Sequence, residues 1–323
     1  MKTISIVLFT TCLLFQIKTN AQFDGYTTHY YDYFSALAYS NDVAEDMVID
    51  NATDNIYVAG ERAKETNLQD IEIIKYKSNG DGDSVYKTYS NPDYKEYVKK
   101  ILWVNDRLFI ICNAVNISAD NPTLLILKYN AKLELVVSSF YLNRSFYTPE
   151  DVAADENGNL YILCYSRSGS SSALAVVKVN SSLSFLDSEV YYYQSLSDTY
   201  QEIPKCIHYN STEGYIYVGG GVVNPLNNTS AALLLKYTAS GLNLTWKKVS
   251  TLQSGRNIYN SVAPGSTKVF AVGSANNALV LRHYSYDGNN SKAVKYNGSS
   301  AAYNANEGLK ITSVTGVGAL VVG

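Results

Sequence analysis

The sequence is poor in the residues that most often carry catalysis or bind metals. Its 323 residues include only 3 His, 4 Cys and 2 Met. The histidines, His29, His208 and His283, are far apart in the chain and show no paired spacing. Because metal-assisted and nucleophilic catalysis usually use a histidine, this scarcity argues against both. We predict no cofactor and no catalytic residue and favour a non-enzyme, although a site assembled from distant segments stays open.

The chain also lacks a dominant charge and, beyond its N-terminus, a long apolar run. Lys and Arg total 26 against 29 Asp and Glu, with both signs interspersed, so no basic stripe is available for nucleic acid. No segment after the N-terminal region offers about 18 consecutive apolar residues, so we expect no membrane span. The 29 Tyr, against 2 Trp and 6 Pro, suit many half-buried strands better than helices.

The N-terminal stretch Met1–Ala21 has the pattern of a secretory signal peptide. Lys2 gives it a basic start, Ile4–Ile17 is apolar, and small or polar residues follow. We predict cleavage before Gln22 and a secreted protein, either extracellular or at the cell surface. A lipoprotein would need Cys12 directly after the apolar run, whereas apolar residues continue beyond it.

One short pattern, an apolar run that ends in a small residue, occurs six times. Its copies end 50 to 56 residues apart, which is the spacing of a repeat architecture. The copies are IYVAG at Ile56–Gly60, LFIIC at Leu108–Cys112, LYILC at Leu160–Cys164, IYVGG at Ile216–Gly220, VFAVG at Val269–Gly273 and ALVVG at Ala319–Gly323. The chain therefore consists of repeated units in a single domain.

Each unit is predicted to be four strands long, with no segment of helical period. In the first unit the expected strands are Met47–Asp50, Ile56–Gly60, Ile71–Tyr76 and Val85–Tyr89. Third strands end in a basic residue, namely Lys75, Lys128, Lys178, Lys236 and Arg282. Four strands in about fifty residues form one blade of a β-propeller, in which neighbouring blades cover both apolar faces of a sheet.

The predicted fold is all-β, a β-propeller of about six four-stranded blades whose last blade is incomplete or closed by the N-terminal strand. The signal peptide is residues 1–21 and the repeat domain residues 22–323. Blades are expected near residues 41–91, 92–143, 144–194, 195–251 and 252–298, with a partial blade at 299–323 that a strand at 23–31 could join. That blade lacks a third strand, so we expect a fragment of a longer protein; a slightly open six-bladed ring is the alternative.

Two segments carry a resemblance to a known repeat family. EDMVIDNATDNIYVAG at Glu45–Gly60, with the strand pair that follows it, resembles the bacterial SBBP-type β-propeller repeat, and EDVAADENGNLYILC at Glu150–Cys164 is a second copy. The related NHL repeat shares the turn but has shorter units. The second and fifth copies lack the Gly-Asn turn. The resemblance implies a secreted propeller scaffold and leaves the activity open.

The three cysteines after residue 21 are Cys112, Cys164 and Cys206. The first two occupy the position of Gly60 in their units, and an odd count without CxxC spacing argues against a disulfide framework or a zinc site. We predict buried free thiols, with one disulfide as the alternative.

The turn Asn79–Asp83 is the only candidate metal site. Asp81 and Asp83 alternate as in the start of a short calcium loop, but no acidic residue follows at the distance an EF-hand needs. A solvated hairpin turn is the favoured interpretation, so we predict no metal. The turn also lacks the aspartate and glycine placement of the sialidase Asp-box.

Loops are where a propeller is expected to meet its partners. Tyr94, Tyr97, Phe146 and Tyr147 precede predicted first strands and are candidate ligand-binding residues at one rim. We predict a monomeric binding module for an unidentified protein or glycan. A lyase or hydrolase with its site in the central channel is one alternative, and a purely structural repeat scaffold in a larger surface protein is the other.

Overall fold

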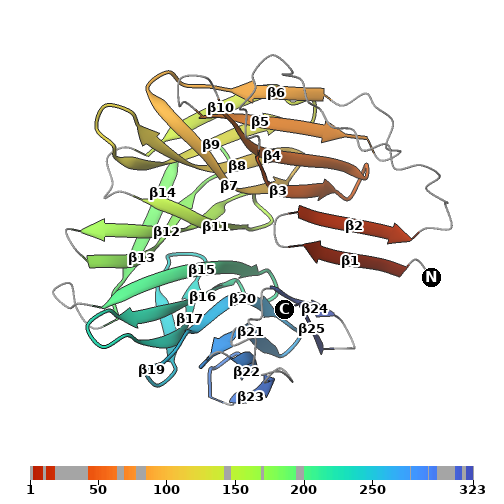
Figure 1. The fold of residues 1–323 in the computed structure, drawn as a ribbon. Coiled ribbons are helices and arrows are strands. Elements are labelled where there is room, and N and C mark those ends of the chain that lie inside the picture. The colour runs from red at the N-terminus through yellow and green to blue at the C-terminus, as the bar shows by residue number, and fades with distance from the viewer. Residues whose placement is uncertain are drawn as a thin grey trace.

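The computed structural model describes most of the repeat domain, and every regular element in it is a β-strand (Figure 1). The described residues are 3–9, 12–18, 43–63, 69–77, 85–141, 147–168, 171–193, 200–276, 278–289, 291–296, 310–314 and 318–322. Within these ranges there is no helix of the length and apolarity that crossing a bilayer requires.

Five four-stranded sheets follow one another along the chain. The first is β3 (Val43–Asp50), β4 (Asn55–Ala63), β5 (Gln69–Tyr76) and β6 (Val85–Tyr89). The second is β7 (Tyr94–Val104), β8 (Arg107–Asn116), β9 (Pro122–Asn130) and β10 (Leu135–Phe140). The third is β11 (Thr148–Ala154), β12 (Leu160–Ser168), β13 (Ser171–Val179) and β14 (Phe185–Tyr191).

The remaining sheets continue the same plan. The fourth is β15 (Gln201–Asn210), β16 (Tyr215–Asn224), β17 (Thr229–Thr238) and β18 (Leu244–Val249), with the two-residue β19 (Gln253–Ser254) also paired to β17. The fifth is β20 (Asn257–Pro264), β21 (Lys268–Ala275), β22 (Ala278–Ser285) and β23 (Ser291–Tyr296). Two further antiparallel strand pairs are β1 (Thr3–Phe9) with β2 (Cys12–Lys18), and β24 (Lys310–Val314) with β25 (Gly318–Val322); β24 packs against the fifth sheet.

In all five sheets the strands pair antiparallel in chain order, and the first strand of each sheet contacts the first strand of the next. This is the arrangement of a β-propeller, in which first strands surround the axis and fourth strands lie at the outside. The all-β prediction is confirmed with five four-stranded blades, and a complete sixth blade is not shown. The expected strand at residues 23–31 lies outside the described residues.

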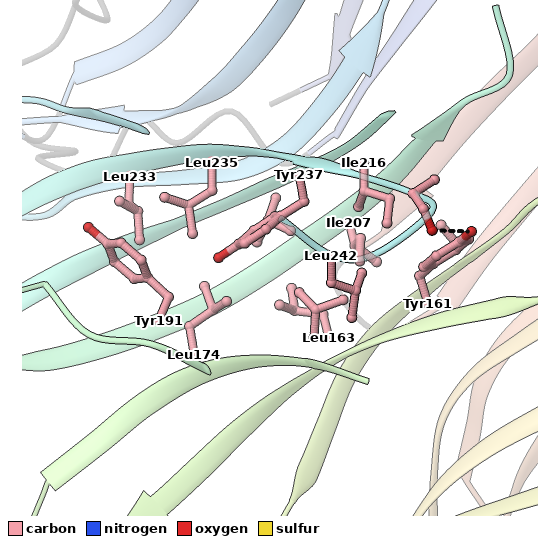
Figure 2. Close-up of a cluster of buried hydrophobic side chains, with 14 of the residues drawn as sticks. Tyr161, Leu163, Leu174, Tyr191, Ile207, Ile216, Leu233, Leu235, Tyr237 and Leu242 are labelled. Carbon is pink, nitrogen blue, oxygen red and sulfur yellow. Dashed lines mark hydrogen bonds between the residues drawn. The ribbon is translucent and has the colours of Figure 1, made fainter. Parts of the chain in front are cut away.

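The six-fold repeated pattern is confirmed as the second strand of its sheet. IYVAG lies within β4, its equivalents lie in β8, β12, β16 and β21, and the described residues of the last copy, Ala319–Val322, lie in β25. Its alternating residues serve opposite faces: Tyr161 and Leu163 pack against the fourth sheet, whereas Leu160 and Ile162 pack against the second. Figure 2 shows the cluster between the third and fourth sheets. Burying each large side chain contributes about 1.5–3 kcal/mol, so neighbouring blades stabilise one another.

The lysine at the end of the third strand connects neighbouring sheets in the first four sheets. Lys178 Nζ donates to the carbonyl of Ala239, 2.7 Å away in the turn between the third and fourth strands of the next sheet. Lys75, Lys128 and Lys236 reach the corresponding turn carbonyls of Ala131, Ser181 and Tyr286 at 2.8, 2.6 and 2.9 Å. The repeated lysine thus ties each of these blades to the next by a hydrogen bond. The sequence shows that the lysine recurs, but not which carbonyl it binds.

First strands are longer than predicted, because each contains a β-bulge. The ladder between first and second strands shifts register at Glu45, Lys99, Glu150, Lys205 and Asn260. A bulge interrupts the two-residue alternation of side chains, so residues before it do not continue the pattern of the strand that follows. Sequence reasoning therefore assigned those residues to loops, whereas they pair with the second strand.

Candidate functional site

The bulges give the first strands a common geometry at one level of the channel. Opposite each bulge the second strand carries the last residue of the repeated pattern, for example Gly220 facing Pro204. A Cβ on Gly220 would lie 2.2 Å from the carbonyl oxygen of Ile203, and one on Gly273 would lie 1.9 Å from that of Ile258. At Gly220 and Gly273 the bulged first strand therefore approaches too closely to leave room for a side chain.

In the second and third sheets the same position holds Cys112 and Cys164. Both, and Cys206, are buried free thiols, as the sequence analysis favoured. Burial raises the pKa of each thiol well above its ordinary value. A thiol with a raised pKa is a poor nucleophile at neutral pH, so none of the three suits covalent chemistry.

The bulged residues carry alternating charge around the channel. Glu45, Lys99, Glu150 and Lys205 succeed one another from the first sheet to the fourth, and Lys205 Nζ lies 3.1 Å from Glu150 Oε1. The Lys205–Glu150 pair links the third and fourth sheets, and because both side chains are partly exposed it contributes only about 0–1 kcal/mol; the fifth bulged residue, Asn260, is uncharged.

The next residue in each first strand joins blades through the backbone. Asp46 accepts a hydrogen bond from the amide of Ile101 at 3.0 Å, and Asp151 accepts one from the amide of Ile207 at 2.9 Å. Lys100 Nζ lies 3.8 Å from Asp46 Oδ2. Burial raises the pKa of Asp151 overall, while Lys100, the Ile207 amide and Lys310 oppose that change. Both carboxylates thus serve as structural acceptors at the channel wall.

His208 on β15 lies, like Asp151, within reach of the charge of Lys310. Burial, and then the charge of Lys310, lower the pKa of His208, which favours the neutral imidazole. Within the ranges that the structure describes, no three His, Cys, Asp or Glu side chains are grouped closely enough to share a metal ion. The channel therefore offers separated polar groups, two of which are already used in inter-blade hydrogen bonds.

A pocket of about 480 Å³ opens between the fourth and fifth sheets. It is bounded by the start of β15, the end of β16, the start of β17 and the approach to β20. Its lining consists of Ile203, Lys205, Gly221, Val223, Asn228, Thr229, Ser230, Gly255, Arg256, Asn257 and Ile258. This volume is within the range of small-ligand sites, and the wall combines aliphatic, amide, hydroxyl and cationic groups.

At Gly221 the backbone of β20 packs directly against the fourth sheet, in place of a side chain. The equivalent positions in the ladders of the other sheets carry side chains, which are Glu61, Asn113, Tyr165 and Ser274. Glu61 extends to the second sheet, where its carboxylate accepts a hydrogen bond from the Val98 amide. At Gly221 no side chain crosses to β20, and even a Cβ would lie only 3.2 Å from the Asn257 carbonyl oxygen.

Hydrogen bonds hold the wall of this pocket in place. Ser230 Oγ donates to the Gly255 carbonyl at 2.7 Å and accepts from the Asn257 amide at 2.8 Å. Asn257 Nδ2 donates to the Gly255 carbonyl, and its Oδ1 accepts from the Asn276 amide at 3.0 Å. Ser230 and Asn257 are 7% and 4% exposed, so these bonds are shielded from water and fix the loop before β20.

The structure does not bring the predicted rim residues into this site. Tyr94 and Tyr97 are strand residues of β7, not loop residues, and Tyr94 packs on Phe140 with ring centroids 4.7 Å apart. Tyr147 is 5% exposed and belongs to the core between the second and third sheets, so its ring has little surface for a ligand. Phe146 and the weak metal candidates Asp81 and Asp83 lie outside the described residues. No short motif marks the pocket, because its residues come from four strands.

Comparison with known proteins supports the fold. No protein-family model and no curated protein sequence matches the chain, so the SBBP family is not identified. Among solved structures, the phage phi92 endosialidase is similar with a TM-score of 0.50 and 9% identity, over 86% of this chain and 61% of that chain. The WD40 domain of Toxoplasma gondii coronin gives a TM-score of 0.46 and 12% identity, covering 79% and 59%. A Bacillus subtilis arabinanase gives 0.37 and 13%, covering 79% and 96%. At these identities the likeness is one of β-propeller fold alone.

Proposed function

We propose that this protein is a secreted binding module that recognises a protein or glycan through the pocket between β15–β17 and β20. The observation that carries the proposal is the pocket itself. It has about 480 Å³ of space, and its wall is fixed in advance by the buried Ser230–Asn257 hydrogen bonds. A preformed pocket loses little conformational entropy when a ligand binds, which favours affinity.

The channel enzyme is the less supported alternative. An acid–base pair would need carboxylates free to exchange protons, whereas Asp46 and Asp151 accept backbone hydrogen bonds from Ile101 and Ile207. A purely structural scaffold would not require a pocket between the fourth and fifth sheets. Both considerations favour binding over the two alternatives.

Arrays of glycans and of peptides, probed with the purified protein, test the proposal. A ligand found there should be lost on Val223→Trp, which places an indole in the pocket at a half-buried strand position where an aromatic residue is well accommodated. The matched control is Val136→Trp, at a 52% exposed position on β10 of another sheet, which should bind normally. Ligand binding that survives Val223→Trp, or hydrolytic turnover without any array binding, would refute the proposed function.

A further inference from the structure

The charged side chains of the pocket all have one sign. Lys205 and Arg256 are the charged residues among those that line it, and none of the lining residues is acidic. Arg256 is exposed and directly follows Gly255, which has a positive φ of 79° and turns the chain into β20. The electrostatic complement of such a wall is an anionic group, and a carboxylate can take charge-assisted hydrogen bonds from both cations.

Lys205 already forms an ion pair with the carboxylate of Glu150. Its Nζ lies 3.1 Å from Glu150 Oε1, and the two side chains are 28% and 25% exposed, so water and a ligand can reach the pair. An ammonium group has three hydrogen atoms to donate, so a second carboxylate can bind without displacing Glu150. Glu150 nevertheless competes for the charge of Lys205, and removing its negative charge should strengthen binding of an anion.

The rest of the lining favours a peptide over a saccharide. Ile203, Val223 and Ile258 supply aliphatic surface, and none of the lining residues is aromatic. The C–H faces of sugar rings pack best on aromatic rings, whose faces carry negative charge density, and this wall offers none. Aliphatic side chains of a peptide need only apolar contact surface, which these three residues provide.

We propose that the pocket binds an acidic peptide segment, with a Glu or Asp carboxylate between Lys205 and Arg256 and an adjacent aliphatic side chain against Ile203, Val223 and Ile258. This inference rests on the proposed function and specifies its ligand class. Asn228 and Thr229 lie at the same wall and are placed to hydrogen-bond the peptide backbone.

Fluorescence anisotropy with three labelled peptides tests the ligand class. The peptides are Ser-Leu-X-Leu-Ser with X as Glu, Gln or Lys, and the probe is titrated with the purified protein. The Glu peptide should bind at least about tenfold more tightly than the Gln peptide, because a charge-assisted hydrogen bond contributes more than a neutral one. Its affinity should fall with added salt, and the Lys peptide should not bind.

Three variants separate recognition from structure. Arg256→Gln should weaken the Glu peptide about tenfold and leave the Gln peptide unchanged. Glu150→Gln should tighten the Glu peptide, whereas loss of a merely structural ion pair would leave it unchanged or weaker. Val223→Trp should abolish binding of the Glu peptide, and Val136→Trp should not. Thermal unfolding of each variant verifies that it is folded.

Each unfavourable result has a distinct meaning. Equal affinity for the Glu and Gln peptides, or no effect of Arg256→Gln, overturns the acidic class. Binding of an acidic saccharide such as oligogalacturonate instead, sensitive to Val223→Trp, overturns the peptide assignment and leaves the pocket as a binding site. Failure of every peptide and saccharide, or binding that Val223→Trp does not change, refutes the proposed function as well.

Discussion

The buried carboxyl of Glu61 gives a quantitative prediction about the pH dependence of stability. Glu61 is a buried residue of β4, 9% exposed, and its carboxylate accepts a hydrogen bond from the Val98 amide in the first strand of the second sheet. Burial, and then the charge of Glu45, raise its pKa from 4.5 to about 7, while the Val98 amide and Lys99 oppose the change. The raised pKa means that the folded state holds a proton that the unfolded state releases.

The sign of the effect follows from this difference. Below pH 4.5 the carboxyl is protonated in both states, so it does not reduce the free energy of unfolding. Between pH 4.5 and about 7 the folded state binds more protons, and stability falls as the pH rises. Above pH 7 the full cost of a buried carboxylate applies, which is about 3 kcal/mol for this change in pKa.

Glu61→Gln removes the charge and keeps a side chain of the same size with an oxygen that accepts from the Val98 amide. We expect the variant to match the wild type at pH 4.5 and to exceed its free energy of unfolding by about 3 kcal/mol at pH 8.5. Urea unfolding followed by tyrosine fluorescence at both pH values measures the difference. Other titrating groups, including His208, are common to both proteins and cancel.

Glu45→Gln is the companion variant, because Glu45 is exposed and acts on Glu61 only through its charge. Without the charge of Glu45 the pKa of Glu61 should be lower. The fall in the free energy of unfolding should therefore be complete at a lower pH than in the wild type. Parallel pH profiles for wild type and Glu61→Gln would refute the reasoning, since they would mean that the carboxyl is ionised without cost in the folded protein.

Three further predictions concern the repeated positions. Gly220→Ala should lower the free energy of unfolding by several kcal/mol in urea, because the new Cβ would lie 2.2 Å from a carbonyl oxygen. Gly214→Ala should cost only about 1 kcal/mol, because nothing lies within 4 Å of its Cβ and only the positive φ of 69° is unfavourable. Lys178→Met should lower the free energy of unfolding by about 1–2 kcal/mol, because the Ala239 and Ser240 carbonyls lose the Lys178 donor and Ala239 keeps only the Tyr161 hydroxyl; a variant as stable as wild type would show that the tie contributes nothing. The thiols of Cys112 and Cys164 should react with a thiol reagent only at the rate of unfolding, and rapid labelling in native buffer would contradict their burial.

Local sequence patterns were sufficient to predict much of the fold. The apolar run ending at Gly60 and its equivalents identified the central strand of every sheet, because a strand covered on both faces needs apolar residues at consecutive positions. The repeat spacing likewise predicted sheets of four strands in chain order. These features depend on neighbours along the chain, which a sequence displays directly.

What only the tertiary structure decided was the site. The bulges at Lys99 and Lys205 interrupt the alternation that reveals a strand, so Tyr94 and Tyr97 were mistaken for loop residues. The pocket joins Lys205 on β15, Val223 on β16 and Arg256 before β20, segments that lie far apart in the chain. These segments meet only where two sheets face each other, and a sequence does not record which positions face each other across sheets.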